Sequence, residues 1–476
     1  MVSGLTRFAI YMKPYRLNIN LKNNSMKRVS VFGLGKVGHV LAICLAAAGH
    51  QVIGVDPDDK IVKGINTGTL VSFEPGVARR LQKVFGKKLT ATLDAEKAVL
   101  ESDISCIIVP TPSNASGGFS LQYVLKVIRS IGRAIARKKT YHLVLVISTV
   151  LPGSSEFVII PELEQAAGKK LGANLGYCYN PIFIALGEVV KGLIEPDYLL
   201  IGESSKRAGD MTITLHAPLI KKTAPIMRQM PIEAEITKIA SNTHETMRVS
   251  FANMLCALTA QVPGANVDQV TGALAHRMGK RFFVGATPYG GPCWPRDNRA
   301  LAAFMDSLGL GSMLPKTIDL YNAWYAKFIR QQILDLTKKG TRVSILGLAY
   351  KVGTPNIERA FGMDLARWLV IAGRKVVVWD PLAIAAARQV LGHKVRYALS
   401  GNGCLEMAEL VVIINPLPEL NQLDWSKVTG TPVLDLWRCL TTQNTTRLKH
   451  YFPWGGKNQK RVWPKQISKT LRELTK

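Results

Sequence analysis

A single cysteine in the stretch YGGPCWPRDNRAL, residues 289–301, has neighbours that suit a reactive thiol. Gly290 and Gly291 let the backbone turn where a side chain would clash, and Pro295 restricts it again two residues after the cysteine. Asp297 follows Cys293 by four residues, which is about one turn if a helix begins here. The pattern is typical of a tight turn that presents a nucleophile beside a carboxylate. Taken alone, it is equally compatible with a buried cysteine in a loop before a helix.

A second cluster with clear chemistry is the glycine pattern VFGLGKVGHV, residues 31–40. A strand pattern precedes Gly33, Gly35 and Gly38, an apolar helix pattern follows, and the next strand pattern ends at Asp56. This spacing is the dinucleotide fingerprint, in which the glycines admit a pyrophosphate to the helix N-terminus. An aspartate at this position holds the ribose 2′-hydroxyl and repels a 2′-phosphate. We therefore predict NAD as the cofactor in preference to NADP; the alternative is a Rossmann-type domain without nucleotide.

The order of these elements recurs in the second half of the chain. VSVFGLGKVG (29–38), AGHQVIGVDP (48–57) and SDISCIIVPTP (102–112) have counterparts in VSILGLAYKVG (343–353), AGRKVVVWDP (372–381) and AELVVIINPLP (408–418). Short β-branched runs that alternate with amphipathic helices indicate parallel sheets covered on both faces. The sequence therefore predicts two doubly wound, Rossmann-like α/β domains.

The second half lacks the complete glycine fingerprint, so we expect it to bind something other than a dinucleotide. Gly347 is kept, but Ala349 and Tyr350 stand where the glycine turn would continue. Lys351 follows the turn directly, in a place where a lysine can meet a phosphate. An exposed surface lysine fits the local sequence as well.

Residues 233–262, between the two α/β patterns, contain neither glycine nor proline. Their apolar residues recur at helical spacing, which predicts one helix of about 45 Å that joins the two domains. A further helix is expected over residues 267–278. A central helix of this kind often carries the interface of a homodimer. The predicted parts are an extension (1–25), an NAD-binding domain (26–220), a central helical region with the cysteine (221–325), a second Rossmann-like domain (326–450) and a basic tail (451–476).

Composition limits the class of protein. The 476 residues suffice for two or three domains, and no apolar run reaches 18 residues, so no membrane span is expected. The seven cysteines are scattered without zinc spacing, which predicts thiols in a reducing, cytoplasmic setting and no metal site. A net charge of +28 fits nucleic acid, an anionic membrane surface or an anionic small substrate. Because the basic residues are spread along the whole chain, nucleic acid is not the expected partner.

Together these motifs resemble the nucleotide-sugar dehydrogenases that make uronic acids, and the UDP-glucose 6-dehydrogenases most closely. The resemblance covers residues 26 to about 440. Its most specific part is the signature Gly-Gly-x-Cys-x-Pro-Lys-Asp, in which Arg296 replaces the lysine here. The other matching segments are EPG (74–76), VPTP (109–112), STVLPG (148–153), NPIFIALG (180–187), EPDYLLIG (195–202), EAEITKIASN (233–242) and ILGLAYKVGT (345–354).

The resemblance implies a two-step oxidation of the sugar C6 alcohol to a carboxylate, with one NAD consumed in each step. Cys293 matches the nucleophile that captures the aldehyde as a thiohemiacetal and then carries the thioester that water hydrolyses. Lys238 matches a lysine that stabilises the developing oxyanion, and Asn242 matches an amide one helical turn away, at the same centre. Asp297 matches a carboxylate that assists proton transfer, and Thr149 a threonine near the nicotinamide and the reacting water.

The fingerprint and the resemblance together predict two binding sites. The cofactor-binding residues are Gly33, Gly35, Val37, Gly38, Asp56, Lys60, Thr111 and Thr149. The substrate-binding residues are Lys238, Asn242, Arg277, Tyr289, Gly290 and Lys351, with Arg277 reaching across a dimer. The implied reaction is the oxidation of UDP-glucose to UDP-glucuronate, and a GDP-mannose-type dehydrogenase is the alternative within the family.

Three motifs depart from the family pattern. Ile182 and Leu186 stand where the family has two glutamates, the first of which is assigned to thioester hydrolysis. An isoleucine can neither accept a proton nor bind water. The segment TPNIERA (354–360) reverses an Arg-Glu pair, and Tyr198 replaces an arginine. We therefore expect slow hydrolysis of the thioester; the alternative is a catalytically weakened member that binds sugar nucleotide and NAD as a regulatory protein.

Overall fold

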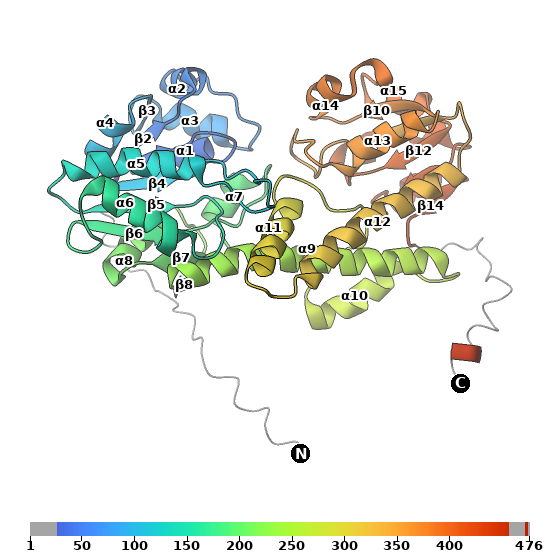
Figure 1. Cartoon of the computed structure of the whole chain (residues 1–476). Coiled ribbons are helices and arrows are strands. Elements are labelled where there is room, and N and C mark those ends of the chain that lie inside the picture. The colour runs from blue at the N-terminus through green and yellow to red at the C-terminus, as the bar shows by residue number, and fades with distance from the viewer. Residues whose placement is uncertain (1–25, 457–471, 475–476) are drawn as a thin grey trace. The chain divides into compact units, whose positions relative to one another are not determined.

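The computed structural model describes residues 26–456 and 472–474, and the chain divides into two compact units at residue 240 (Figure 1). The predicted extension, residues 1–25, lies outside the described residues, as do residues 457–471 and 475–476 of the predicted tail. No helix in the described part of the chain is long and apolar enough to cross a membrane.

The first unit contains an eight-stranded sheet whose first six strands follow the Rossmann winding. Its order is β3 (Leu89–Thr92), β2 (Gln51–Val55), β1 (Arg28–Phe32), β4 (Ile104–Ile107), β5 (His142–Val146), β6 (Leu175–Tyr179), β7 (Leu199–Glu203) and β8 (Ile226–Gln229). Strands β4, β5 and β6 are buried at every position, as expected for a sheet covered on both faces. Strand β7 runs antiparallel to β6 and β8 runs parallel to β7, so the last two strands reverse the direction of the sheet.

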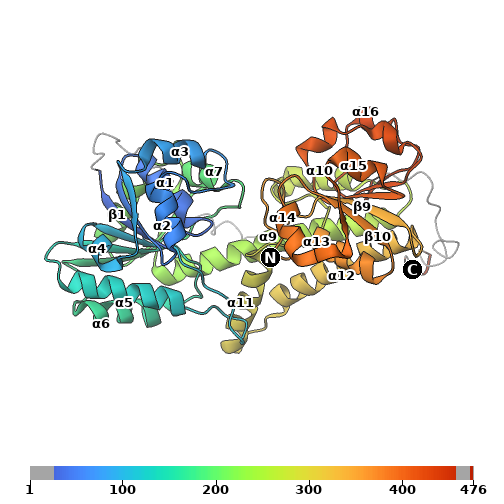
Figure 2. The same cartoon turned by 90° about the horizontal axis from the view of Figure 1, so that it is seen from above.

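Helices cover both faces of this sheet. Figures 1 and 2 show α5 (Gln122–Ala136) and α6 (Ile160–Ala167) on one face, and α1 (Gly38–Ala47), α3 (Val77–Val84) and α7 (Val189–Ile194) on the other. Each face has its own apolar core. The remaining helical segments are α2 (Asp59–Asn66), α4 (Ala95–Leu100), α8 (Lys206–His216) and a π-helical turn, Ser155–Ile159, that leads into α6.

The second unit contains a six-stranded, fully parallel sheet with the same winding. Its order is β11 (Arg396–Tyr397), β10 (Lys375–Trp379), β9 (Arg342–Leu346), β12 (Leu410–Ile413), β13 (Val433–Asp435) and β14 (Tyr451–Pro453). The helices around it are α13 (Phe361–Ile371), α14 (Ile384–Leu391), α15 (Gly401–Glu406) and α16 (Thr442–Thr445). Strand β14 lies beyond residue 450, so the sheet continues into the segment that was predicted to be the tail.

Four further helices occupy the middle of the chain. Helix α9 (Pro231–Gln261) confirms the predicted long helix and begins with a proline, which suits the first turn because its missing N–H would have no helical partner there. It starts in the first unit and continues into the second. Helix α10 (Val267–Met278) has its predicted bounds, and α11 (Trp294–Ser307) and α12 (Met313–Asp335) follow. The predicted domain boundary at residue 325 falls inside α12.

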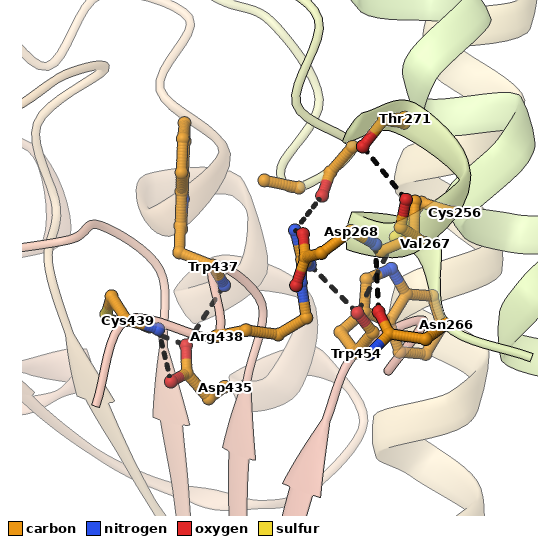
Figure 3. A network of polar contacts seen from close by, with 12 residues as sticks. Cys256, Asn266, Val267, Asp268, Thr271, Asp435, Trp437, Arg438, Cys439 and Trp454 are labelled. Atoms are coloured by element: carbon orange, nitrogen blue, oxygen red, sulfur yellow. Dashed lines mark hydrogen bonds and ion pairs between the residues drawn. The ribbon is translucent and has the colours of Figure 1, made fainter. Parts of the chain in front are cut away.

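Arg438 ties the sheet of the second unit to α10 (Figure 3). Its φ of 54° is unusual for a residue other than glycine. The side chain is 6% exposed, and its guanidinium pairs with Asp268 at 2.9 and 3.0 Å and donates to the carbonyls of Gly285 and Trp454 at 2.8 Å each. Because a buried guanidinium is costly unless its donors are used, these contacts fix the start of α10 against the C-terminal sheet.

Candidate active site

The predicted phosphate-binding turn follows β1 and leads into α1. Gly33 has a φ of 89°, and a Cβ on Gly38 would overlap the carbonyl oxygen of Gly33, so both positions need glycine. A Cβ on Gly35 would meet no atom of the described chain within 4 Å, its two chain neighbours aside. The middle glycine therefore faces open space at the helix N-terminus, beside the N-cap residue Val37, where a pyrophosphate fits.

Asp56 lies beside this turn, immediately after β2. Its Oδ2 accepts the backbone N–H of Leu34 at 2.7 Å, and its Oδ1 accepts that of Asp58 at 2.9 Å. A carboxylate has about four acceptor sites, so each oxygen keeps capacity for a ribose hydroxyl. Lys60 is exposed in the first turn of α2. The residues of this turn therefore fit NAD.

The counterpart of this aspartate in the second unit, Asp380, has no such capacity. Its Oδ2 accepts the N–H groups of Leu348 and Ala349 at 2.8 and 3.1 Å, and its Oδ1 accepts those of Leu382 and Ala383 at 2.9 and 2.8 Å. All four acceptor sites are used by the backbone, which leaves none for a ribose. The second half keeps the architecture of the first but not its means of holding a dinucleotide.

The loops after β4 and β5 are joined at the carboxyl edge of the first sheet, where these two strands are parallel neighbours. The hydroxyl of Thr111 donates to the carbonyl of Thr149 at 2.8 Å, and the hydroxyl of Ser148 donates to the carbonyl of Val109 at 2.7 Å. These bonds bring together the two threonines of the predicted cofactor site.

The ammonium group of Lys238 is held by the segment that lacks the family's glutamates. Lys238 lies on α9 and is 8% exposed; its Nζ donates to the carbonyl of Ile182 at 3.0 Å and lies 4.5 Å from the ring centre of Phe183. The side chains of Ile182 and Leu186 pack against the apolar core. The contacts of Lys238 with this segment are the carbonyl oxygen of Ile182 and the ring of Phe183, and neither Ile182 nor Leu186 provides a carboxylate.

Glu74, from the EPG motif, holds the other end of the same segment. Its buried carboxylate accepts the N–H of Gly187 at 2.6 Å and that of Val189, the first residue of α7, at 3.0 Å. Two charge-assisted hydrogen bonds of this length are strong contacts. They anchor the backbone of this segment, although two of its side chains differ from the family pattern.

Cys293 presents an exposed thiol at the N-terminus of α11. It is the N-cap residue, and the N–H of Asp297 donates to its carbonyl at 2.8 Å, which confirms the predicted helical turn between the two residues. The positive end of a helix of 14 residues stabilises a thiolate, the reactive form of this side chain. The exposure of the thiol rules out the interpretation of Cys293 as a buried structural cysteine.

The carboxylate of Asp297 is fully buried and has two side-chain partners. Its Oδ2 accepts from the amide of Asn242 at 2.5 Å, and its Oδ1 accepts from Nε of Arg296 at 2.8 Å. Burial opposes the charge of Arg296, but Asp297 and Cys293 outweigh burial and raise the pKa of Arg296 above its usual value. One fixed cation therefore interacts with both Cys293 and Asp297.

The paired glycines allow the cysteine loop to pack closely against the second α/β domain. A Cβ on Gly290 would overlap the carbonyl oxygen of Arg359, and one on Gly291 would lie 2.6 Å from the ring of Tyr350. The N–H of Gly291 donates to the carbonyl of Glu358 at 3.0 Å. A side chain at either glycine would push the loop that carries the thiol away from this domain.

The other predicted substrate residues lie on separate elements of the second unit. The hydroxyl of Tyr289 donates to Asp319 on α12 at 2.5 Å, so this side chain anchors the cysteine loop. Arg277 is exposed in the last turn of α10, and Lys351 is half-buried in the loop that follows β9. Their contacts with a substrate remain predictions.

The sequence patterns indicate no role for Glu74 or Glu235 and do not reveal the contacts of Arg296. Glu235 is fully buried on α9, three residues before Lys238. A charged residue is almost never fully buried unless it has partners. A role for Glu235 could therefore have been inferred from its position one turn before Lys238, on the same face of the helix.

Sequence models of one family match most of the chain. The NAD binding domain of the UDP-glucose/GDP-mannose dehydrogenase family matches residues 27–220, its central domain residues 232–324, and its UDP binding domain residues 344–442. The three matches follow one another in the order of the structural elements described above.

Individual relatives are similar over most of their length. UDP-glucose 6-dehydrogenase AglM of Haloferax volcanii is 32% identical over 406 residues, which are 83% of this chain and 93% of that protein. GDP-mannose 6-dehydrogenase of Pseudomonas aeruginosa is 36% identical over 362 residues, 74% of this chain and 81% of that protein. The structure of a UDP-glucose dehydrogenase from Pyrobaculum islandicum, at 31% identity, matches 91% of this chain and 99% of its own with a TM-score of 0.83.

Proposed function

Since the chain belongs to the UDP-glucose/GDP-mannose dehydrogenase family of NAD-dependent enzymes, we propose that it oxidises the C6 alcohol of a nucleotide sugar to a carboxylate through Cys293. UDP-glucose is the proposed substrate and UDP-glucuronate the product, which the UDP binding domain match supports. GDP-mannose is the alternative, since relatives of both kinds match. The observation that carries the proposal is the exposed Cys293 thiol at the N-terminus of α11, beside Arg296.

NAD, when bound at the turn after β1, supplies the hydride acceptor for each of the two oxidations. In the first, the alcohol loses a hydride and a proton, and Lys238 stabilises the negative charge that develops on its oxygen. The Cys293 thiolate then adds to the aldehyde carbon, and the new C–S bond gives a thiohemiacetal. Loss of a second hydride and proton leaves a thioester on Cys293. Water adds to its carbon, the C–S bond breaks, and the thiolate leaves as the acid is released.

Two further groups support these steps. Arg296 favours the thiolate of Cys293 over the thiol, because a guanidinium stays charged at any working pH. Asn242 orients the carboxylate of Asp297, which assists proton transfer to and from the reacting oxygen.

The proposal is tested with UDP-glucose, GDP-mannose and UDP-N-acetylglucosamine, each with NAD, by following the absorbance of NADH. We expect NADH with UDP-glucose. NADH with GDP-mannose alone would select the alternative substrate. If none of the three yields NADH, the enzyme assignment is wrong.

The second candidate function is a regulatory protein that binds NAD and a nucleotide sugar without turnover. The apolar packing of Ile182 and Leu186 favours it, because no proton acceptor stands at either position. Calorimetric binding of UDP-glucose, with no NADH formed in its presence, would support this candidate over the enzyme.

We expect the unmodified protein to bind NAD more tightly than NADP, and Asp56→Ala to narrow this preference. Hydrogen bonds to a charged group contribute about 1.5–3 kcal/mol, so the affinity for NAD should fall by roughly ten- to a hundredfold. Calorimetric titrations with NAD and with NADP measure the two dissociation constants. Asp59→Ala, which removes an exposed aspartate of α2, is the control and should leave the preference unchanged. Equal affinity of the unmodified protein for both cofactors would contradict the assignment.

We also propose that the protein forms a homodimer through α9. Met247, Phe251, Met254 and Leu258 are 37–57% exposed and follow one another at intervals of four, three and four residues. This spacing places them on one face of the helix, where a continuous apolar stripe suits a second copy of the same stripe.

The double variant Met254→Glu, Leu258→Glu is expected to be monomeric at concentrations where the unmodified chain is dimeric. Burying carboxylates without partners costs several kcal/mol and so weakens association by at least a hundredfold. Light scattering coupled to gel filtration gives the mass of each species. Leu93→Glu, at a 56% exposed position of the first unit, is the control. A monomeric parent, or a dimeric double variant, would rule out this interface.

A further inference from the structure

Glu235 is a fully buried residue on α9. None of the reaction steps described above uses its carboxylate. Its two oxygens accept the N–H of Gly153 at 2.6 Å, the N–H of Ser155 at 2.8 Å and the hydroxyl of Ser155 at 2.6 Å. Three donors from one short segment therefore converge on a single charged group of another element.

The segment that Glu235 holds is the loop after β5 that carries Thr149. Near its start the loop is fixed to the segment after β4 by two hydrogen bonds. The Ser148 hydroxyl donates to that segment, and the Thr149 carbonyl accepts from it. At its end, Gly153 and Ser155 are fixed by Glu235. The loop is thus pinned on both sides of Thr149, and only the second attachment comes from α9.

A carboxylate suits this position better than any neutral side chain. Ser155 begins the π-helical turn that continues as α6, and the N–H groups at a helix start lack partners within the helix. Since the Ser155 hydroxyl donates to the carboxylate, the Tyr177 hydroxyl, 2.6 Å away, donates in turn to Ser155. Burial raises the pKa of Glu235, and the hydrogen bonds from Ser155 and Gly153 counteract only part of this effect.

The same helix carries Lys238 three residues later, and its Nζ bonds the carbonyl of Ile182. One turn of α9 therefore holds two separate loops of the first unit, one through Glu235 and one through Lys238. We propose that Glu235 is a positioning residue, which sets the place of Thr149 relative to Lys238. The inference rests on the proposed function in that it assumes roles for Thr149 and Lys238 in the reaction.

The test is Glu235→Gln in the full chain. The amide has the same shape, but its NH2 group faces N–H donors, so at least one of the three bonds is lost and replaced by a repulsive contact. We expect the single-turnover rate of NADH formation to fall at least tenfold. The dissociation constant of NADH should change less than threefold, because Asp56 and the glycine turn are untouched. Hydrogen exchange of peptides covering residues 147–155 should become faster.

Glu233→Gln is the matched control. Glu233 is exposed on the same first turn of α9, and its carboxylate accepts the N–H of Met230 at 2.8 Å. We expect Glu233→Gln to leave the single-turnover rate of NADH formation, the dissociation constant of NADH and the hydrogen exchange of residues 147–155 unchanged within twofold.

A milder variant keeps the test decisive if Glu235→Gln does not fold. Ser155→Ala removes one of the three donors and should slow NADH formation and speed exchange in the same direction by a smaller factor. Where both variants fold, their combination should be less than additive, because they break the same contact. A lower melting temperature with an unchanged rate and unchanged exchange would show that Glu235 is merely structural and would overturn the proposal.

Failure of the proposed function is recognised separately. If the unmodified protein makes no NADH with any nucleotide sugar tested, two measurements still test the positioning role of Glu235. They are the fluorescence emission of added, bound NADH and the hydrogen exchange of residues 147–155, since neither measurement needs turnover. A changed emission and faster exchange in Glu235→Gln support the positioning of this loop. Emission and exchange identical to those of the unmodified protein refute it.

Discussion

Cys293→Ser is expected to form no detectable nucleotide-sugar acid. The N-terminus of α11 and the guanidinium of Arg296 lie beside the Cys293 thiol, and a positive charge near a thiol favours its thiolate. A serine hydroxyl in the same place stays protonated, adds poorly to an aldehyde and leaves poorly from an ester. The affinity for NAD should stay within twofold of the parent value, because the cofactor turn lies after β1. Chromatography of the products and calorimetric titration with NAD provide the two measurements.

Cys439→Ser is the matched control, because its thiol has the opposite environment. Burial and the neighbouring Asp435 raise the pKa of Cys439 well above its usual range, so this thiol stays neutral. We expect its replacement to leave acid formation within twofold of the parent rate. If Cys293→Ser makes acid at the parent rate, Cys293 is not the nucleophile.

Hydrolysis of the thioester is expected to be the slow step, with a burst of NADH followed by a slow phase. The side chains of Ile182 and Leu186 are partly buried against the apolar core, and each oxygen of Asp297 already accepts one hydrogen bond, from Asn242 or Arg296. Neither apolar side chain can act as a general base, and the loss of such a base typically slows a step by about a hundred- to ten-thousandfold. During the slow phase, intact-protein mass should show a sugar-nucleotide adduct on Cys293.

Ile182→Glu is expected to shorten the life of this adduct. The ammonium of Lys238 lies 3.0 Å from the carbonyl oxygen of residue 182, so a new carboxylate there has a cation to pair with. Ala185→Glu adds the same charge at an exposed position of the same segment and should not affect the adduct. A linear time course without any adduct would mean that another residue of the chain activates the water.

The sequence predicted best what depends on local spacing. The glycines at 33, 35 and 38 and the carboxylate at 56 specify a turn whose geometry is fixed within one βαβ unit, and the structure confirms this turn. The long glycine- and proline-free stretch likewise predicted α9, because helical periodicity over 30 residues has no other common explanation.

Contacts between distant segments could not be predicted in this way. Strand β14 is only three residues long and ends in proline, which a sheet tolerates at its edge, so it resembles a tail in sequence. The hydrogen bonds of Asp380 and Glu235 depend on which N–H groups the folded chain brings near them. Two aspartates in equivalent repeats, at 56 and 380, look alike in sequence and differ only in how many of their acceptor sites are already occupied.

The attachment of Glu235 also constrains the order in which the chain can mature during synthesis. The ribosome releases Gly153 and Ser155 about 80 residues before Glu235, so these N–H groups lack their carboxylate partner until Glu235 emerges. The sheet of the first unit ends at Gln229, six residues earlier. A nascent chain that already contains every strand of this sheet therefore still lacks the group that closes the loop bearing Thr149, and completion of the nucleotide-binding half waits for a helix that continues into the other half.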